Sequence, residues 1–219
     1  MNIQDFILNQ IKELSPEHTI ACAQEICKNL TISHIPIVKN KKLLGCLPES
    51  DIQTIGNKDG FLKDYNYLFN YFYTNERATL LDLISLFADN DCNLIPVLDK
   101  ELNYLGYFEL GDILNVFANS PFLHSNSETI IVEKPQTAYS MSQISQIVES
   151  NKGKLLGMYI ACSNEEKVQI CLKVSTDSLN RIIQTFRRYD YVVLSQHEDD
   201  FYLKELKNQD RYLRKYLSM

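Results

Sequence analysis

Residues 32–52 read ISHIPIVKNKKLLGCLPESDI, and residues 92–113 read CNLIPVLDKELNYLGYFELGDI. Both stretches contain an apolar strand with a proline, a polar turn, a second apolar run with a glycine, and then an aspartate. The landmarks recur at offsets of 60 or 61 residues: Pro36 and Pro96, Gly45 and Gly106, Asp51 and Asp112. Because the residue types match along with their spacing, we interpret the two stretches as an internal repeat.

Each half of this repeat has the same predicted secondary structure. Apolar residues at helical spacing and N-capping residues at Thr19 and Thr79 favour a helix at the start of each half. The predicted helices are 19–30, 49–55, 79–90 and 110–118, and the predicted first strands are 35–38 and 95–98. The order is α-β-β-α after an extended leading segment. A glycine inside a strand suggests close approach by another backbone or by a ligand, which we expect at Gly45 and Gly106.

This pattern resembles the CBS domain, which occurs in tandem pairs. The resemblance covers roughly residues 1–120, with repeat 1 expected over 1–60 and repeat 2 over 61–120. It is carried by the Ile-Pro-Ile-Val and Ile-Pro-Val-Leu-Asp strands and by the Gly-x-x-x-x-x-Asp spacings that end at Asp51 and Asp112. CBS pairs typically sense adenosine nucleotides or S-adenosylmethionine in clefts between the two repeats, so the resemblance implies a ligand of this class.

The resemblance also implies which residues would hold such a ligand. Nucleotide-binding CBS repeats follow the pattern Gly-h-h-Ser/Thr-x-x-Asp, where h is apolar. The aspartate accepts hydrogen bonds from the ribose hydroxyls, and the Ser/Thr hydroxyl helps to hold phosphate. Asp51 and Asp112 match the aspartate, but Pro48 and Glu109 stand at the hydroxyl positions. A lost hydrogen bond to a charged group removes about 1.5–3 kcal/mol, so we expect weak nucleotide binding or a preference for an uncharged adenosyl group.

Other side chains beside the repeated strands are further candidates for ligand binding. These are Ser33, His34, Pro36, Arg77, Asn93, Ile95 and Pro96. Asp51 and Asp112 also fit a purely structural role, because an acid in the first turn of a helix interacts favourably with the helix dipole. The sequence leaves both roles open.

The second half of the chain has a different pattern. We expect a linker over 121–128, an α/β domain over 129–200 and a C-terminal amphipathic helix over 201–219. The expected strands are 129–133, 154–161, 168–174 and 191–194, and the expected helices are 140–151 and from Thr176 or Asp177 to 188. The resulting order, βαββαβ, is the ferredoxin-like split βαβ arrangement.

This element order resembles the ACT domain, a regulatory module that often binds amino acids and pairs into dimers. Amino-acid-binding ACT domains usually have a glycine between the first strand and the first helix, and residues 134–139 contain none. Dimerisation is therefore the expected role. A CBS pair followed by an ACT-like domain resembles the acetoin-utilisation regulatory protein family of bacteria. The predicted fold class is α+β or α/β: a CBS-domain pair, a ferredoxin-like βαββαβ ACT-type domain and a C-terminal helix.

Composition and charge narrow the functional classes. The chain has 219 residues, a formal net charge of −6 and a pI of about 5.3, which argues against nucleic acid as a partner. Lys39, Lys41 and Lys42 form a basic cluster that we interpret as a solvated turn. The six cysteines form no Cys-x-x-Cys motif, which favours reduced thiols in a reducing compartment. Because no apolar run reaches membrane-spanning length and no leader pattern opens the chain, we expect a cytoplasmic protein.

No catalytic or metal-binding motif stands out in the sequence. The histidines are scattered, and His197 with the three acids after it is interpreted as a solvated turn. We therefore expect a non-catalytic regulatory protein without a resident cofactor or metal. Its CBS pair would sense AMP, ADP, ATP or S-adenosylmethionine and modulate an unidentified protein partner.

The alternative is a constitutive dimerisation or interaction module whose degenerate clefts bind no nucleotide. In either case we expect a homodimer that forms through the CBS repeats, the ACT-like domain or both. Neither nucleic acid nor a membrane is an expected partner.

Overall fold

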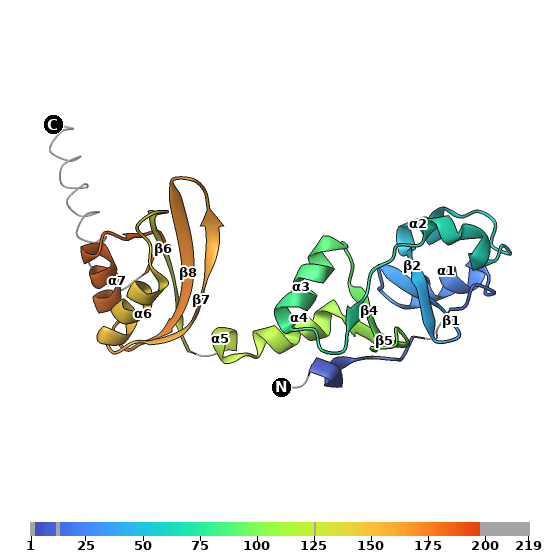
Figure 1. Cartoon of the computed structure of the whole chain (residues 1–219), viewed down its shortest axis with the longest axis horizontal. Helices are drawn as coiled ribbons and strands as arrows, with labels where there is room; N and C mark the ends of the chain where they lie inside the picture. Colours follow the sequence, from blue (N-terminus) through green and yellow to red (C-terminus); the bar gives the residue numbers. More distant parts are fainter. Residues whose placement is uncertain (1–2, 12–13, 125, 198–219) are drawn as a thin grey trace, which may run out of the picture. The chain divides into compact units, whose positions relative to one another are not determined.

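The computed structural model describes residues 3–11, 14–124 and 126–197 of the chain. These residues form two compact units, Met1–Phe117 and Ala118–Met219, each of which is described by itself (Figure 1). The C-terminal helix predicted over 201–219 lies outside the described residues. Within the described part, no helix is long and apolar enough to cross a membrane.

Unit 1 contains the two predicted α-β-β-α repeats. Repeat 1 consists of α1 (Ile20–Asn29), β1 (His34–Lys39), β2 (Lys42–Pro48) and α2 (Glu49–Thr54). Repeat 2 consists of α3 (Leu80–Asp89), β4 (Leu94–Leu98), β5 (Tyr104–Glu109) and α4 (Leu110–Ala118), with the short strand β3 (Thr74–Asn75) parallel to β4. Thr19 caps α1 and Thr79 caps α3 as predicted, the second in a capping box with Asp82.

The two strand pairs have equivalent registers. β1 and β2 are antiparallel with Ile37 opposite Gly45, and β4 and β5 are antiparallel with Val97 opposite Gly106. Both ladders shift register directly after this pair. The duplication that is visible in the sequence therefore extends to the details of the backbone.

A second backbone comes close to each of the two glycines. The backbone of Leu8 exchanges hydrogen bonds with Tyr107 (2.8 and 2.9 Å), and Asn70 does the same with Cys46 (2.9 and 2.7 Å). A Cβ atom on Gly106 would lie 2.3 Å from the Leu8 carbonyl oxygen, and φ is +149° at this glycine. At Gly45, φ is +150° and a Cβ atom would lie 2.8 Å from the Phe69 Cβ atom. Of the two predicted alternatives, backbone or ligand, the structure thus places a backbone at both glycines.

Through these contacts, the segment that precedes each repeat in the sequence (its leading segment) packs on the other repeat. The segment with the 3-10 helix η1 (Ile3–Phe6) packs into the core of repeat 2, although it belongs to repeat 1 in the sequence. The 3-10 helix η2 (Leu62–Leu68) packs into the core of repeat 1, although it follows residue 60. Residues on each side of the expected boundary at 60/61 therefore pack into the core of the other repeat, so the two repeats share structure across this boundary.

Unit 2 has the element order βαββαβ. Its elements are β6 (Glu128–Pro135), α6 (Met141–Ser150), β7 (Lys154–Ser163), β8 (Lys167–Ser175), α7 (Leu179–Arg188) and β9 (Val192–Val193). The sheet is antiparallel with strand order β7-β8-β6-β9, and α6 and α7 contribute to the core above its apolar face. This is the ferredoxin-like arrangement of a split βαβ pair.

One segment of this half contains a helix that was not predicted, and the predicted start of another helix is wrong. The segment predicted as a linker contains a short helix, α5 (Pro121–His124), whose Phe122 packs against Gly157 of β7. The residue that precedes α7 is Ser178 and not Thr176 or Asp177. The Thr176 hydroxyl instead accepts a hydrogen bond from the Ser178 backbone N–H at 3.1 Å, so it orders the turn before the helix.

Candidate ligand-binding site

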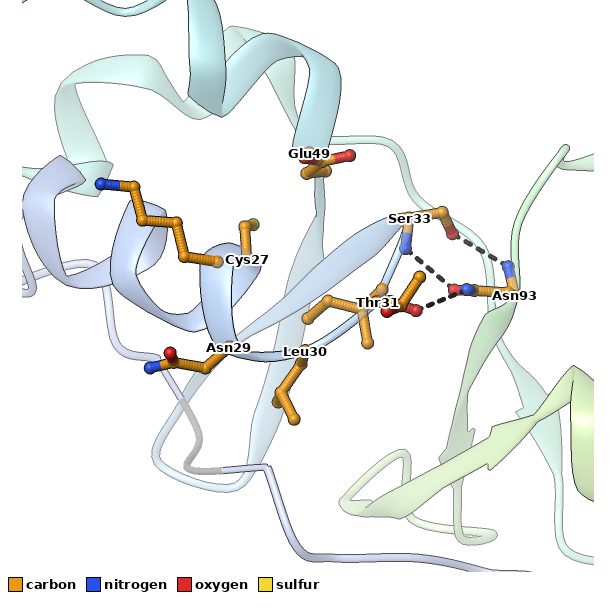
Figure 2. A pocket seen from close by; sticks show the side chains of 9 residues that line it. Cys27, Asn29, Leu30, Thr31, Ser33, Glu49 and Asn93 are labelled. Carbon is orange, nitrogen blue, oxygen red and sulfur yellow. Dashed lines mark hydrogen bonds between the residues drawn. The ribbon is translucent and has the colours of Figure 1, made fainter.

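Ser33 and Asn93, which are equivalent residues of the two repeats, meet where the repeats join. The Ser33 N–H donates to Asn93 Oδ1 at 2.8 Å, and the Asn93 N–H donates to Ser33 Oγ at 2.9 Å (Figure 2). Asn93 Nδ2 also donates to the Thr31 carbonyl oxygen at 2.8 Å. Both side chains were candidate ligand contacts, and the structure uses their polar atoms to hold one repeat against the other.

A second set of equivalent residues continues this junction. Val38, Leu43, Leu98 and Tyr104 form a small buried cluster. The Tyr104 N–H donates to the Lys41 carbonyl oxygen at 2.7 Å, which joins the two hairpins directly. The junction is therefore polar at Ser33 and Asn93 and apolar at this cluster, and it leaves side openings between the repeats.

One opening is a hollow of 360 Å³ that we call the Glu49 hollow (Figure 2). It is lined by Cys27, Lys28, Asn29, Leu30, Thr31, Ile32, Ser33, Glu49 and Asn93. The pKa of the Cys27 thiol is raised to about 11, mainly by burial and further by the charge of Glu49. Cys27 is therefore a protonated, unreactive wall residue at neutral pH.

The other opening is a hollow of 400 Å³ that we call the Glu109 hollow. It is lined by Gln10, Ile11, Asn29, Leu30, Thr31, Ile32, Leu94, Tyr107 and Glu109. Burial raises the pKa of Tyr107, and the charge of Glu109 raises it further. The Tyr107 side chain is also hydrogen-bonded to the backbone of Ile11 and Gln10. The Tyr107 phenol therefore stays protonated and holds the leading segment at the edge of the hollow.

The equivalent place in repeat 1 is filled by side chains. His34 stands at the position of Leu94, and its ring meets the edge of Phe72 with ring centroids 5.3 Å apart. Both residues are buried, with 7% of His34 and 8% of Phe72 exposed. Burial lowers the pKa of His34, and the charges of Asp91 and Asp51 oppose this effect, so the ring is mainly neutral at pH 7. The clefts of the two repeats are thus unequal.

The remaining sequence candidates lie outside both hollows. Asp51 and Asp112 are partly exposed in the first turns of α2 and α4, and neither lines a hollow. Arg77 is exposed, and its backbone N–H donates to Asn75 Oδ1 at 2.8 Å. The other candidates are buried strand residues: Pro36, Ile95 and Pro96.

The sequence did not predict segment 29–32, which lines both hollows, or Glu49 and Tyr107 as lining residues. Glu109 was noticed only as a departure from the hydroxyl pattern. A carboxylate at a position where the family pattern has a hydroxyl is the one sequence signal that pointed to this hollow. Segment 29–32 carries no such signal, because it is a connection whose role depends on the path of the leading segments.

The Glu109 hollow combines apolar walls with acidic and amide groups. Leu30, Ile32 and Leu94 supply apolar surface, Asn29 and Gln10 supply amides, and the carboxylate of Glu109 is exposed. None of the residues that line it is a lysine, arginine or histidine. Such a site favours a flat, uncharged or cationic polar ligand and disfavours a phosphate. Among the described residues, no group of three or more His, Cys, Asp or Glu side chains could hold a metal ion.

Comparison with known proteins identifies the class of unit 1. Residues 69–119 match the family model of the CBS domain, so the chain contains a CBS domain in repeat 2. Because repeat 1 has the same element order and ladder register, unit 1 has the fold of a CBS-domain pair.

Two curated proteins are similar to about half of the chain. The CBS domain-containing protein YhcV of Bacillus subtilis is 27% identical over 116 residues, which are 51% of this chain and 82% of YhcV. The inosine-5'-monophosphate dehydrogenase of Methanocaldococcus jannaschii is 25% identical over 111 residues. These are 50% of this chain but only 22% of the dehydrogenase.

Two solved structures also resemble about half of the chain. A CBS domain pair/ACT domain protein from Thermotoga maritima shares 14% identity with a TM-score of 0.48, over 53% of this chain and 96% of that chain. The structure of CBSX2 in complex with AMP shares 16% identity with a TM-score of 0.44, over 53% of this chain and 95% of that chain.

Proposed function

We propose that this chain is a non-catalytic regulatory protein whose CBS pair binds an adenosine-containing ligand in the Glu109 hollow and thereby modulates a protein partner. CBS-domain proteins are generally regulatory. The observation that carries the proposal is the asymmetry of the clefts: repeat 2, which matches the CBS family model, has an open hollow of 400 Å³, whereas His34 and Phe72 fill the equivalent place in repeat 1.

The lining chemistry supports a ligand without phosphate groups. A carboxylate at Glu109 repels phosphate, and no cation in the lining compensates for it. Apolar side chains on several sides suit the faces of an adenine base. S-adenosylmethionine carries a cationic sulfonium group and no phosphate, so we expect it to bind better than adenosine and much better than AMP, ADP or ATP. Asp112 does not line the hollow itself, but its charge acts on the Tyr107 side chain of the lining, so it is the proposed acceptor for ribose hydroxyls at the edge of the hollow.

Melting temperatures of the full chain with each ligand would test the proposal. At about a hundredfold excess over Kd, a ligand stabilises the folded state by about 2.7 kcal/mol, which raises Tm by several degrees. We expect this rise with S-adenosylmethionine, its loss in Asp112→Ala, and its retention in Asp51→Ala, the equivalent substitution in repeat 1. Glu109→Gln should weaken the binding of S-adenosylmethionine more than the binding of adenosine. A flat response to all these ligands at millimolar concentration would refute ligand sensing.

The second candidate function is constitutive assembly without a ligand. Three features favour it: the reciprocal bonds of Ser33 and Asn93, the filled cleft of repeat 1, and Pro48 at a phosphate-binding position. Under this hypothesis adenosyl ligands leave both Tm and the oligomer mass unchanged. Analytical ultracentrifugation with and without S-adenosylmethionine separates the two functions, because only a sensor should change in Tm, in mass or in both.

We further propose that unit 2 is an ACT-like dimerisation module and that the chain acts as a cytoplasmic homodimer. The βαββαβ order and the antiparallel sheet with β7 at one edge support this assignment. Strand β7 is an edge strand of the described sheet, and its Tyr159 and Ile160 are 53% and 43% exposed, so it offers backbone groups and apolar surface to a second copy. A monomeric mass in ultracentrifugation at micromolar concentration would refute the dimer.

A further inference from the structure

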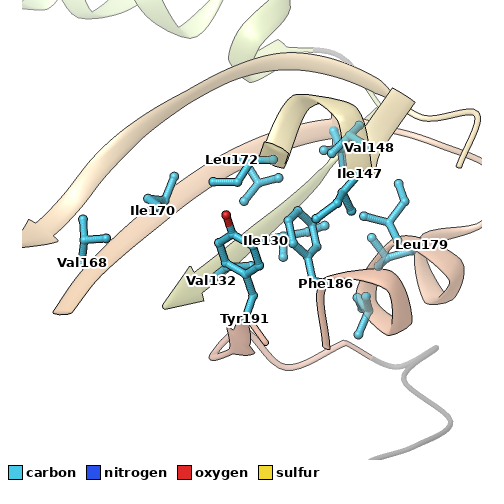
Figure 3. Packing of buried hydrophobic residues seen from close by; sticks show 14 residues of the cluster. Ile130, Val132, Ile147, Val148, Val168, Ile170, Leu172, Leu179, Phe186 and Tyr191 are labelled. Atoms are coloured by element: carbon cyan, nitrogen blue, oxygen red, sulfur yellow. The ribbon is translucent and has the colours of Figure 1, made fainter. Parts of the chain in front are cut away.

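Unit 2 has a hollow of 440 Å³ between α6 and α7 that is separate from the CBS pair. The apolar side chains of the two helices, including Ile147 and Phe186, belong to the core that packs on the sheet (Figure 3). The hollow is lined mainly by polar side chains of both helices, among them Gln143, Gln146 and Arg188. A polar hollow of this size falls within the range of small-molecule sites.

Within the part of the chain that the structure describes, Arg188 is held by one hydrogen bond and keeps most of its hydrogen-bonding capacity. Its Nη2 donates to the Thr185 hydroxyl at 2.8 Å, and that hydroxyl donates to the Arg181 carbonyl oxygen at 2.8 Å. Thr185 is only 5% exposed, so the hydroxyl that holds the exposed Arg188 is itself buried. The two ion pairs of the described residues, Lys39–Glu17 and Lys167–Glu133, do not involve Arg188. Among the described residues its hydrogen-bond acceptor is the Thr185 hydroxyl, which leaves several guanidinium N–H donors for a ligand at the edge of the hollow.

Gln143 is oriented by a second positive charge. Its Oε1 atom accepts from Lys134 Nζ at 3.2 Å, and the same ammonium donates to the Tyr189 carbonyl oxygen at 2.7 Å. Lys134 also lies 4.1 Å from the centroid of the Tyr191 ring. Because Oε1 is occupied, Gln143 has its amide N–H groups left for a ligand.

The charge balance of the lining is positive. Arg188 lines the hollow and Lys134 lies behind it, whereas no aspartate or glutamate is among the lining residues. Glu149 and Asp190 are adjacent in sequence to lining residues, but both are exposed, so water screens their charges. A fork of guanidinium N–H groups beside amide donors matches the two oxygens of a carboxylate or a phosphate.

We propose that the hollow between α6 and α7 is a binding site for a small organic oxyanion, a carboxylate or a phosphate ester, with Arg188 as its main ligand contact and Gln143 and Gln146 as secondary donors. The ligand differs in charge from the one proposed for the CBS pair. Unit 2 would therefore give the protein an input that is independent of the adenosyl ligand.

The test is an NMR titration of the isotope-labelled full chain with two probes, inorganic phosphate and succinate, at ionic strength held constant with chloride. We expect a saturable shift of backbone amide signals in residues 143–151 and 185–189 with at least one probe. Arg188→Gln should weaken this binding about tenfold to a hundredfold, because it removes a charge-assisted contact. The matched control is Lys173→Gln, which loses the same charge in strand β8 outside the hollow lining.

Each outcome bears on the proposal. A response to phosphate alone identifies a phosphate site, and a response to succinate alone identifies a carboxylate site. Saturable shifts that persist in Arg188→Gln, or that Lys173→Gln abolishes equally, would overturn the assignment. The absence of any saturable shift with both probes would overturn the site itself, and the amide spectrum of each variant shows whether it is folded.

Discussion

Repeat 1 and repeat 2 place different side chains on nearly the same backbone. The equivalent pairs are His34 and Leu94, Cys46 and Tyr107, and Pro48 and Glu109. In repeat 2 these residues line a hollow with a carboxylate at its edge, whereas in repeat 1 a buried ring pair closes the same place. The ladder register and the exchanged leading segments are common to both, so they belong to the scaffold. The side chains that differ are the ones that decide whether the cleft of a repeat is open or filled.

Substitutions at Gly45 and Gly106 should have the largest effects on stability, because each repeat depends on a second chain segment that lies close to its glycine. Gly106→Ala should destabilise the protein by about 3 kcal/mol or more, since the new Cβ atom meets the Leu8 carbonyl oxygen and φ is +149°. Gly45→Ala should cost about 2 kcal/mol, because φ is +150° there and the new Cβ atom would lie 2.8 Å from the Phe69 Cβ atom, a longer contact than at Gly106. Urea denaturation followed by circular dichroism measures both.

Gly111 provides the control for these two substitutions. It lies in α4 with no atom within 4 Å of an added Cβ. Gly111→Ala should stabilise the helix by up to about 1 kcal/mol. If Gly106→Ala were as stable as the wild type, the exchanged segment would not pack on repeat 2 as described.

Substitutions at the junction should have smaller effects. Asn93→Ala removes the two hydrogen bonds of the Asn93 side chain, from the Ser33 N–H and to the Thr31 carbonyl oxygen, and should cost about 1–3 kcal/mol. Ser33→Ala removes the hydroxyl that accepts from the Asn93 N–H and should cost about 1 kcal/mol. In a double-mutant cycle by urea denaturation, the two losses should be non-additive. An Asn93→Ala variant as stable as the wild type would show that this residue does not hold the repeats together.

The scaffold was readable from the sequence because its landmarks are local. Proline and glycine at fixed positions in the strands, and threonine before the first helix of each repeat, predict elements through the conformations they allow. The recurrence of these residues at an offset of 60 or 61 then showed that the elements repeat. Gly45 and Gly106 even predicted a close neighbour, although their environment in the sequence does not say which one.

The candidate site was less predictable because it depends on contacts between distant residues. Ser33 and Asn93 are polar side chains near a ligand-type motif, and only the folded chain shows that they satisfy each other. The closure of repeat 1 requires Phe72 to reach His34 from the exchanged segment. Asp51 and Asp112 lie at pattern positions, yet the hollows are lined by segment 29–32, which no pattern marks.

The smallest expected effect is a pH dependence that only repeat 1 should have. Burial lowers the pKa of His34 in the folded state, and the facing charges of Asp91 and Asp51 reduce this shift without reversing it. The unfolded chain therefore binds a proton at a higher pH than the folded chain does. Stability contributed by the neutral ring is complete above the unfolded pKa of about 6.5 and declines as the pH falls through that value toward the folded pKa.

His34→Leu gives repeat 1 the residue that repeat 2 has at Leu94 and removes this titration. We expect the free energy of unfolding to fall less between pH 7.5 and pH 5.5 in the variant than in the wild type, measured by urea denaturation at several pH values. The difference between the two curves isolates His34, because every other residue is the same in both proteins. Parallel curves would show that His34 is not desolvated, and the filled cleft of repeat 1 would then have to be open to water.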